Sequence, residues 1–360
     1  MKIAYIAHVN FSRNSGVVKK ILSQATWWRQ FGHLVRVFWL TRKEELQAGA
    51  SEWEEFIVYK GGPMSASRHL ALRDLGFRVR SWSPDLVYLR RDMVYPTYVA
   101  LAETFPTVVE INSDELAELR LYKQFAHYVY HSLSRPLLDR RVKGFVFPTR
   151  ELAYSSYYRR VLAHKKVIAN GIDFRVIPTL PPAVNEKPVL VFLGEVASWH
   201  GIDKICRLAL AFPDWKFHLI GVDKVVCASA NVVAHGFLTK EQYLPIIATA
   251  DVGIGTLALH RKGMNEASPL KVREYLALGL PVIIAYDDTD FPEGAPFILR
   301  LPNTENNIEG SLAEIRRFVG EWKGRRVPRS AISHLDLAVK EKERLLFFEQ
   351  VLASSARIYN

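Results

Sequence analysis

The sequence has very few cysteines and no long apolar run. Its 360 residues include only Cys206 and Cys227, whose spacing is not that of metal ligands. This argues against a disulfide-stabilised extracellular domain and favours a reducing, cytoplasmic setting. No apolar stretch reaches the length that crosses a bilayer. The opening MKIAYIAHVNFSRN lacks the apolar region of a signal peptide, so we expect no secretory leader.

Acidic residues are fewer than basic ones, 37 against 48, which gives a net charge of +11. Such an excess favours an anionic partner: a nucleic acid, a phosphorylated ligand or an anionic membrane surface. No nucleic-acid-binding module is recognisable, so we expect no nucleic-acid partner. The chain exceeds the usual size of a single hydrophobic core, which predicts two domains.

Apolar segments typical of buried strands alternate with helical segments in two successive series. This pattern predicts an α/β fold with two doubly wound, Rossmann-like domains, each built on a parallel sheet. Four prolines in eleven residues indicate an extended linker. We therefore expect an N-terminal domain at 1–177, a linker at 178–187 and a C-terminal domain at 188–344, with a final helix at about 345–360 that is free to pack back on the N-terminal domain. The expected strands are 2–9, 34–41, 85–90, 107–112 and 144–149, then 188–195, 215–222, 231–236, 251–258 and 281–286.

The segment EASPLKVREYLALGLPVI, from Glu266 onward, has the chemistry of a capped helix between a loop and a strand. Ser268 suits the N-cap, Pro269 the first helical position and Gly279 the position after the helix. Glu266 then lies in the preceding loop, and Glu274 lies nearly two turns inside the helix.

The start of this helix is a candidate anion site. The N–H groups of Leu270 and Lys271 lie in its first turn, where unpaired donors and the helix dipole favour negative charge. The Lys271 side chain adds a cation. Two carboxylates, amides and a lysine could together bind a nucleotide-sugar, although an amphipathic helix with solvated charges is the simpler alternative for two glutamates at this spacing.

The same segment, with Glu266, Glu274 and ALGLPVI (277–283), resembles the signature of glycosyltransferase family 4, retaining enzymes of the GT-B fold. Three further segments resemble that family in the same order: IANGID (168–173), VFLGEVASWHGID (191–203) and VVAHGFLTKEQYLPIIATADVGI (232–254). The resemblance implies two Rossmann-like domains facing across a cleft. It implies a metal-independent hexosyltransferase that uses a nucleotide-diphosphate sugar as substrate, without a cofactor. The acceptor would be a saccharide or a lipid-linked sugar in cell-surface polysaccharide or glycolipid synthesis.

By this resemblance, Glu266 would bind hydroxyls of the transferred sugar, and Glu274 those of the ribose. The turn from Ser268 through Leu270 to Lys271 would hold the diphosphate. Gly194, in the loop after the first strand of the second domain, would lie near the phosphates. Gly236 and Phe237, in a later turn, would lie near the base.

Two positions depart from the family pattern. Many members have an arginine and a lysine that bind the diphosphate where this chain has Glu195 and His200. Charge stabilisation of a leaving group is usually a large part of catalysis, so this loss matters. Lys271 could replace part of it, and His200 could still donate a hydrogen bond to phosphate or sugar. The changed positions keep open the alternative of a non-catalytic sugar-nucleotide binding or scaffold protein. A nucleotide-sugar epimerase or hydrolase of the same fold is a further alternative, against which the family 4 motifs argue.

In the first domain, Ser15 and Gly16 head a helix where similar sequences have a glycine-rich turn; a plain helix cap is the alternative. Asn112, in EINSDE (110–115), stands where many members have a cleft histidine, and His8 is a further candidate. The run DDTD (287–290) follows a strand and is typical of a turn rather than a metal site. We expect no essential metal.

Residues 119–143 combine six basic residues with interspersed aromatic and aliphatic ones. Basic amphipathic segments can bind anionic lipid. One hypothesis is therefore peripheral attachment to the inner face of the cell membrane. The alternative is an ordinary helix with a solvated basic face.

Overall fold

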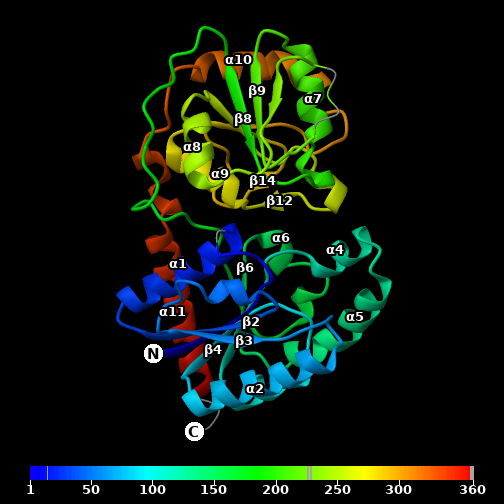
Figure 1. Ribbon diagram of the computed structural model, residues 1–360, viewed down its shortest axis with the longest axis vertical. Coiled ribbons are helices and arrows are strands. Elements are labelled where there is room, and N and C mark those ends of the chain that lie inside the picture. The colour runs from blue at the N-terminus through cyan, green and yellow to red at the C-terminus, as the bar shows by residue number, and fades with distance from the viewer. Residues whose placement is uncertain (14, 225–226, 228, 357–360) are drawn as a thin grey trace. The chain divides into compact units, whose positions relative to one another are not determined.

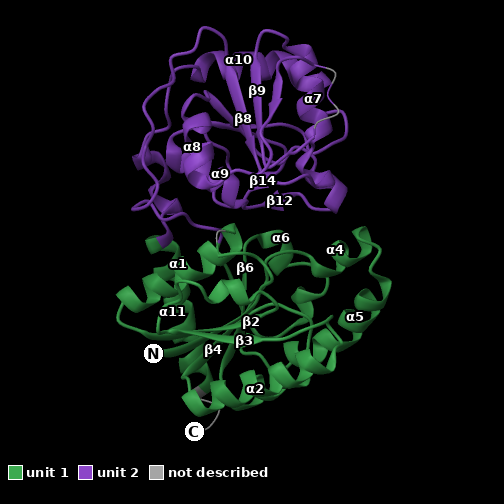
Figure 2. Cartoon of the chain, in the orientation of Figure 1, with its two compact units in different colours: residues 1–168, 338–360 green, residues 169–337 purple. Residues whose placement is uncertain are grey.

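Figure 1 shows a computed structural model of the chain, which describes residues 1–13, 15–224, 227 and 229–356. The chain forms two compact units (Figure 2): unit 1 contains residues 1–168 and 338–360, and unit 2 contains residues 169–337. The division lies before the proline-rich segment 178–187 that the sequence suggested as a linker. That segment already belongs to unit 2, because the Leu180 N–H donates to the Leu278 carbonyl at 3.0 Å and Arg326 Nε donates to the Pro181 carbonyl at 3.0 Å.

Unit 1 is built on a seven-stranded parallel sheet in the order β3-β2-β1-β4-β5-β6-β7. The strand β1 lies inside this sheet and is buried along most of its length, from Ile3 to Ala7. The strands are β1 (Lys2–His8), β2 (Leu34–Thr41), β3 (Glu54–Val58), β4 (Leu86–Arg90), β5 (Thr107–Glu110), β6 (Gly144–Phe147) and β7 (His164–Val167). The helices are α1 (Gly16–Gln30), α2 (Ala66–Trp82), α3 (Pro96–Thr104), α4 (Glu115–Leu121), α5 (Phe125–Asp139), α6 (Arg150–Ala153) and α11 (Leu337–Ala356).

Helix α11 completes the core of unit 1, although it comes last in the chain. Phe348 packs edge-on against Trp28 of α1, with ring centroids 5.4 Å apart. Buried polar groups fix the helix further: the Glu341 carboxylate accepts from Trp28 Nε1 at 2.7 Å and from Arg344 Nε at 2.9 Å. A buried carboxylate satisfied by several donors holds its helix in a single register.

Unit 2 is built on a six-stranded parallel sheet in the order β10-β9-β8-β11-β13-β15. The strands are β8 (Val189–Leu193), β9 (Lys216–Ile220), β10 (Val232–Ala234), β11 (Val252–Ile254), β13 (Val282–Ile284) and β15 (Ile298–Arg300), and β12 (Glu266–Ala267) pairs separately with β14 (Asp287–Asp288). The helices are α7 (Ile202–Ala211), α8 (Lys240–Ala248), α9 (Leu270–Leu278) and α10 (Leu312–Trp322).

Both sheets reverse their strand order beside the first strand, at β1 in unit 1 and at β8 in unit 2. In doubly wound folds, ligands bind outside the carboxyl ends of the strands at this switch point. For unit 2 this places the expected ligand site where β8 and β11 end. Within the described part of the chain, no helix is both long and apolar enough to span a bilayer.

Candidate functional site

Three glycines lie together where β8, β9 and β10 of unit 2 end. The Gly221 N–H donates to the Gly236 carbonyl at 2.7 Å, and a Cβ at Gly221 would lie 2.7 Å from the Gly194 carbonyl oxygen. All three have positive φ, 147° at Gly194, 85° at Gly221 and 65° at Gly236, which disfavours residues with a side chain. Glycine is therefore favoured at all three positions by the backbone conformation, and at Gly221 also by the close approach of the Gly194 carbonyl.

The absent side chain at Gly194 leaves room for Lys271. A Cβ at Gly194 would lie 2.6 Å from Lys271 Nζ. The ammonium lies 4.1 Å from the centroid of the Phe192 ring and is buried, with no hydrogen-bond partner among the residues that the structure describes. Burial lowers the pKa of Lys271 from 10.5 to about 7, and the Glu195 carboxylate opposes this only in part. An amine in this state is stabilised by an incoming anion.

His200 lies beside this lysine and corrects one sequence-based expectation. Its Nδ1 is 2.7 Å from the Glu195 carbonyl oxygen, which can only accept, so Nδ1 carries the proton. Burial, followed by the charge of Lys271, lowers the pKa of His200 to about 4. Near neutral pH the remaining nitrogen, Nε2, therefore has a lone pair. The ring is set to accept a hydrogen bond from a hydroxyl, not to donate one to a phosphate.

The start of α9 lies one residue later than expected. Pro269 is the N-cap residue, no side chain caps the helix, and the helix begins at Leu270. Ser268 does not cap it because its Oγ is used elsewhere: it accepts from the Asn170 N–H at 2.9 Å and from Arg273 Nη2 at 2.8 Å. The first-turn amides of α9 are thus left without a side-chain cap, as an anion site requires.

Sequence reasoning missed a buried ion pair that supports this segment. Arg273 is fully buried and makes two bonds of 2.7 Å to the Asp288 carboxylate. Burial alone would lower the pKa of Arg273, but the Asp288 carboxylate outweighs it and raises the pKa. Asp288 belongs to the DDTD run, whose first two residues form β14 instead of the expected turn. The pairing Glu266↔Asp287 between β12 and β14 fixes the backbone of Glu266.

The carboxylate of Glu274 is held by a residue that was not singled out in the sequence. Tyr243 of α8 donates its hydroxyl to Glu274 Oε1 at 2.8 Å. Burial, and next the Glu274 carboxylate, raise the pKa of Tyr243, so the phenol keeps its proton at neutral pH. Phe237, next to Gly236, is 83% exposed. Among the described residues there is no group of three or more His, Cys, Asp or Glu side chains that could hold a metal ion.

The remaining candidates lie in unit 1. Ser15 Oγ accepts from the Val18 N–H at 3.3 Å and so caps α1, the alternative role considered for it, and Gly16 is the exposed first residue of that helix. Asn112 Oδ1 accepts from Lys20 Nζ at 3.1 Å, beside the ion pair of Lys20 with Glu110 at 3.0 Å. The structure thus brings Gly194, His200 and Lys271 together in unit 2, whereas Ser15, Gly16 and Asn112 are parts of unit 1.

Two doubly wound parallel sheets of this kind define the GT-B architecture of glycosyltransferases, and solved structures of that class match the chain along nearly its whole length. The lipopolysaccharide outer core galactosyltransferase WaaB in its apo form matches with a TM-score of 0.68 and 15% identity over 99% of this chain and 100% of that chain. Sucrose-phosphate synthase from Thermosynechococcus elongatus matches with a TM-score of 0.65 and 14% identity over 99% and 98%. Anabaena HepE in complex with UDP and glucose matches with a TM-score of 0.65 and 14% identity over 97% and 100%. At these identities the likeness shows the fold. No protein-family model and no curated protein matches the sequence.

Proposed function

We propose that this protein is a glycosyltransferase that moves a sugar from a nucleotide-diphosphate sugar to a hydroxyl of a saccharide or lipid-linked acceptor. The observation that carries the proposal is the ammonium of Lys271, which is buried beside Gly194 at the switch point of unit 2 and has no hydrogen-bond partner among the described residues. Such a group is costly unless a ligand supplies the missing negative charge. The resemblance of the sequence to family 4 and the GT-B fold both support a diphosphate as that ligand.

In the proposed complex, the diphosphate lies between Lys271 and the first-turn amides of α9, beginning at Leu270. Glu274, held by Tyr243, binds the ribose, and Glu266 binds hydroxyls of the transferred sugar. The loop at Gly236 and Phe237 lies near the base. His200 accepts a hydrogen bond from a sugar hydroxyl through Nε2. Uridine is the first base to test, because the structurally similar HepE was solved with UDP and glucose.

The proposed reaction breaks the bond between the anomeric carbon and the diphosphate oxygen and forms a bond from that carbon to the acceptor oxygen. The diphosphate leaves with the bonding electrons and takes the acceptor proton on the same face, so the anomeric configuration is retained and no protein base is needed. No metal is required, since Lys271 and the helix amides stabilise the leaving charge. Asn112 would face the acceptor, as family 4 resemblance suggests.

The test compares Glu266→Ala with Glu293→Ala, an exposed glutamate of unit 2, as matched control. Purified protein is incubated with UDP-sugars and saccharide acceptors in EDTA, and the product anomer is read by NMR. We expect transfer with retention, lost in Glu266→Ala and kept in the control. Unchanged turnover in Glu266→Ala, or an inverted product, would refute the assignment. Nucleotide binding without any transfer would favour a binding or scaffold protein, and an epimerised nucleotide-sugar would favour an epimerase.

We place this activity in the cytoplasm, where nucleotide-sugars are available to a lipid-linked acceptor on the inner face of the cell membrane. Fractionation of cells that produce the tagged protein checks the location. Recovery only outside the cytoplasmic and membrane fractions would contradict it.

A further inference from the structure

Helix α5 of unit 1 turns four large apolar side chains outward. Every residue of α5 that is exposed is apolar, and the four large ones recur at intervals of four along the helix. Residues four apart lie on one side of a helix. The exposed fractions are 65% for Phe125, 54% for Val129, 74% for Leu133 and 53% for Leu137. We call these four side chains the α5 stripe; a contiguous apolar surface of this kind usually marks a contact with another apolar phase.

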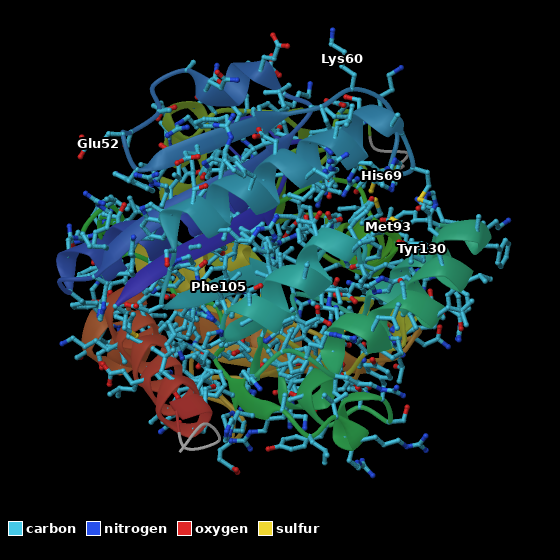
Figure 3. The ribbon with its side chains drawn as sticks, turned by 90° about the horizontal axis from the view of Figure 1, so that it is seen from below. Glu52, Lys60, His69, Met93, Phe105 and Tyr130 are labelled. Atoms are coloured by element: carbon cyan, nitrogen blue, oxygen red, sulfur yellow. The ribbon has the colours of Figure 1, made fainter. Side chains whose placement is uncertain are left out.

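Two ionisable residues of α5, His131 and Asp139, point inward, and their contacts help to fix the rotation of the helix. His131, 2% exposed, lies with Nε2 3.0 Å from the Glu115 carboxylate. Asp139, also 2% exposed, accepts from Arg91 Nη2 at 2.5 Å and from the Tyr157 hydroxyl at 2.8 Å. Tyr130, labelled near Met93 in Figure 3, donates its hydroxyl to the Val94 carbonyl at 2.5 Å. Contacts from successive turns hold this orientation, so the α5 stripe is a fixed feature of the surface.

Positive charge borders the α5 stripe at both ends. Residues 119–143 contain six Lys and Arg residues and one acid, Asp139, which is buried in its pair with Arg91. Arg120 and Lys123 are exposed before the helix, and Arg140 is exposed directly after it. Tyr122, 58% exposed, adds an aromatic ring at the first of these ends.

We propose that the α5 stripe docks this protein on an anionic lipid bilayer, with the helix lying in the interface plane. An apolar face edged by long basic side chains suits this position, because the apolar groups enter the acyl region while the cations reach the headgroups. The inference is independent of the proposed function, since lipid binding needs no nucleotide.

The charges favour a lipid surface over a second copy of the chain. Two copies paired through their α5 stripes, parallel or antiparallel, would place a basic end of one helix against a basic end of the other. Like charges facing each other across an interface oppose association. Anionic headgroups complement both ends at once, and each basic residue near such a surface strengthens binding roughly fivefold.

Vesicle co-sedimentation tests the proposal with the full chain, using phosphatidylcholine vesicles with and without phosphatidylglycerol. We expect binding to the anionic vesicles that weakens in about 1 M salt, where charge interactions are screened within about 3 Å. The double variant Leu133→Gln/Leu137→Gln should bind these vesicles at least about tenfold more weakly, because two large apolar groups no longer enter the bilayer. The control Leu210→Gln replaces a leucine of α7 in unit 2 that is 56% exposed, and should bind as the unaltered protein does.

The charge contribution is tested separately. Arg120→Gln/Lys123→Gln/Arg140→Gln should lose roughly a hundredfold in affinity for anionic vesicles, while exposed Arg73→Gln/Arg317→Gln should lose little. Thermal unfolding and circular dichroism report whether each variant is folded. UDP-glucose binding is a separate readout of the proposed function, since all α5-stripe changes lie in unit 1 and Lys271 lies in unit 2. The proposal is overturned if the folded stripe variant binds vesicles as well as the unaltered protein. It is also overturned if sedimentation velocity shows a dimer that the stripe variant abolishes, which would assign the surface to self-association. Loss of nucleotide binding with intact vesicle binding would refute the proposed function alone.

Discussion

Replacing Lys271 by methionine should remove the pH dependence of donor binding. The pKa of Lys271 is lowered to about 7, so in the free protein the amine is largely charged at pH 6 and about one tenth charged at pH 8. A bound diphosphate favours the charged form and draws a proton from solvent. Methionine fills a similar volume but cannot take up that proton.

The size of the effect follows from this pKa. If only the charged amine binds the diphosphate, affinity for a nucleotide-sugar falls about tenfold between pH 6 and pH 8. Binding then takes up roughly 0.9 proton at pH 8 and roughly 0.5 proton at pH 7. UDP-glucose is the appropriate probe, because its diphosphate is esterified at both ends and does not titrate in this range.

Isothermal titration calorimetry in two buffers of different ionisation enthalpy measures the proton uptake directly. Lys271→Met should bind UDP-glucose at least about tenfold more weakly at pH 6 and take up no proton at Lys271. Lys187→Met, at an exposed position of unit 2, is the matched control and should keep both properties of the unaltered protein. Equal affinity at pH 6 and pH 8 in the unaltered protein, with no proton uptake, would refute the reasoning.

The same change should stabilise the ligand-free fold. Between pH 7 and pH 10.5 the unfolded chain binds a proton at Lys271 that the folded chain does not, so the free energy of unfolding rises with pH across this window and the cost is fully present below pH 7. At pH 7 the cost has an upper bound of about 4 kcal/mol. Lys271→Met should therefore raise Tm at pH 6–7 while weakening donor binding. A lower Tm there would contradict the assigned burial of the ammonium.

Three further substitutions in unit 2 test neighbouring contacts. Gly194→Ala would place a Cβ 2.6 Å from Lys271 Nζ on backbone with φ of 147°, so UDP-glucose binding by calorimetry should weaken about tenfold, whereas Gly310→Ala, where a Cβ meets nothing within 4 Å, should not change it. Asp288→Asn removes one of the two carboxylates beside the buried guanidinium of Arg273, the other being Asp290 at 3.0 Å, and should lower the free energy of unfolding of unit 2 by about 2 kcal/mol; a urea midpoint equal to that of the unaltered protein would count against the pair. Tyr243→Phe removes the hydrogen bond to Glu274, so KM for the donor should rise about fivefold with little change in kcat, and an unchanged KM would deny Tyr243 a positioning role.

The inner strands of both sheets were predictable because parallel strands that are buried on both faces have continuous apolar sequences. Strand β1, with its buried stretch Ile3 to Ala7, has such a sequence. Of the four edge strands, β10 lies within the expected strand 231–236, whereas β3, β7 and β15 were not predicted. β7 (His164–Val167) contains two lysines, since an edge strand has one side open to solvent and charged residues are tolerated there. β3 (Glu54–Val58) begins with two glutamates, the first of which is buried in an ion pair with Arg13.

In the candidate site, the sequence predicted the spacing of neighbouring residues but not the contacts between residues far apart in the chain. The spacing of Glu266 and Glu274 is visible in the sequence. The ion pair of Arg273 with Asp288 depends on the pairing of β12 with β14, and no local sequence pattern predicts that pairing. The same cause explains the wrong N-cap: Ser268 has the right residue type, but the buried guanidinium of Arg273 and the amide of Asn170 use its oxygen.

Helix α5 shows why an amphipathic pattern alone does not assign a surface. Periodicity reveals that a helix has an apolar side, but not whether that side faces the core. The basic residues of 119–143 suggested a solvated basic face, yet the exposed positions within α5 are apolar, and His131 and Asp139 are buried. What decides the orientation is the ion pair of Asp139 with Arg91, a residue 48 positions earlier.

Many members of family 4 have an arginine and a lysine where this chain has Glu195 and His200, so the proposed phosphate site here has less positive charge than theirs. Neutral His200 contributes no positive charge, and its proton is already donated to the Glu195 carbonyl. Lys271 is then the cation next to Gly194, and burial lowers its pKa to about 7. A fixed cation at position 200 would lower the pKa of Lys271 further, because the two positions are close enough for the charge of Lys271 to lower the pKa of His200. Because the imidazole at position 200 is neutral, Lys271 can still take up a proton when the diphosphate binds. The residues Glu195 and His200, which differ from the family 4 pattern, are therefore compatible with donor binding.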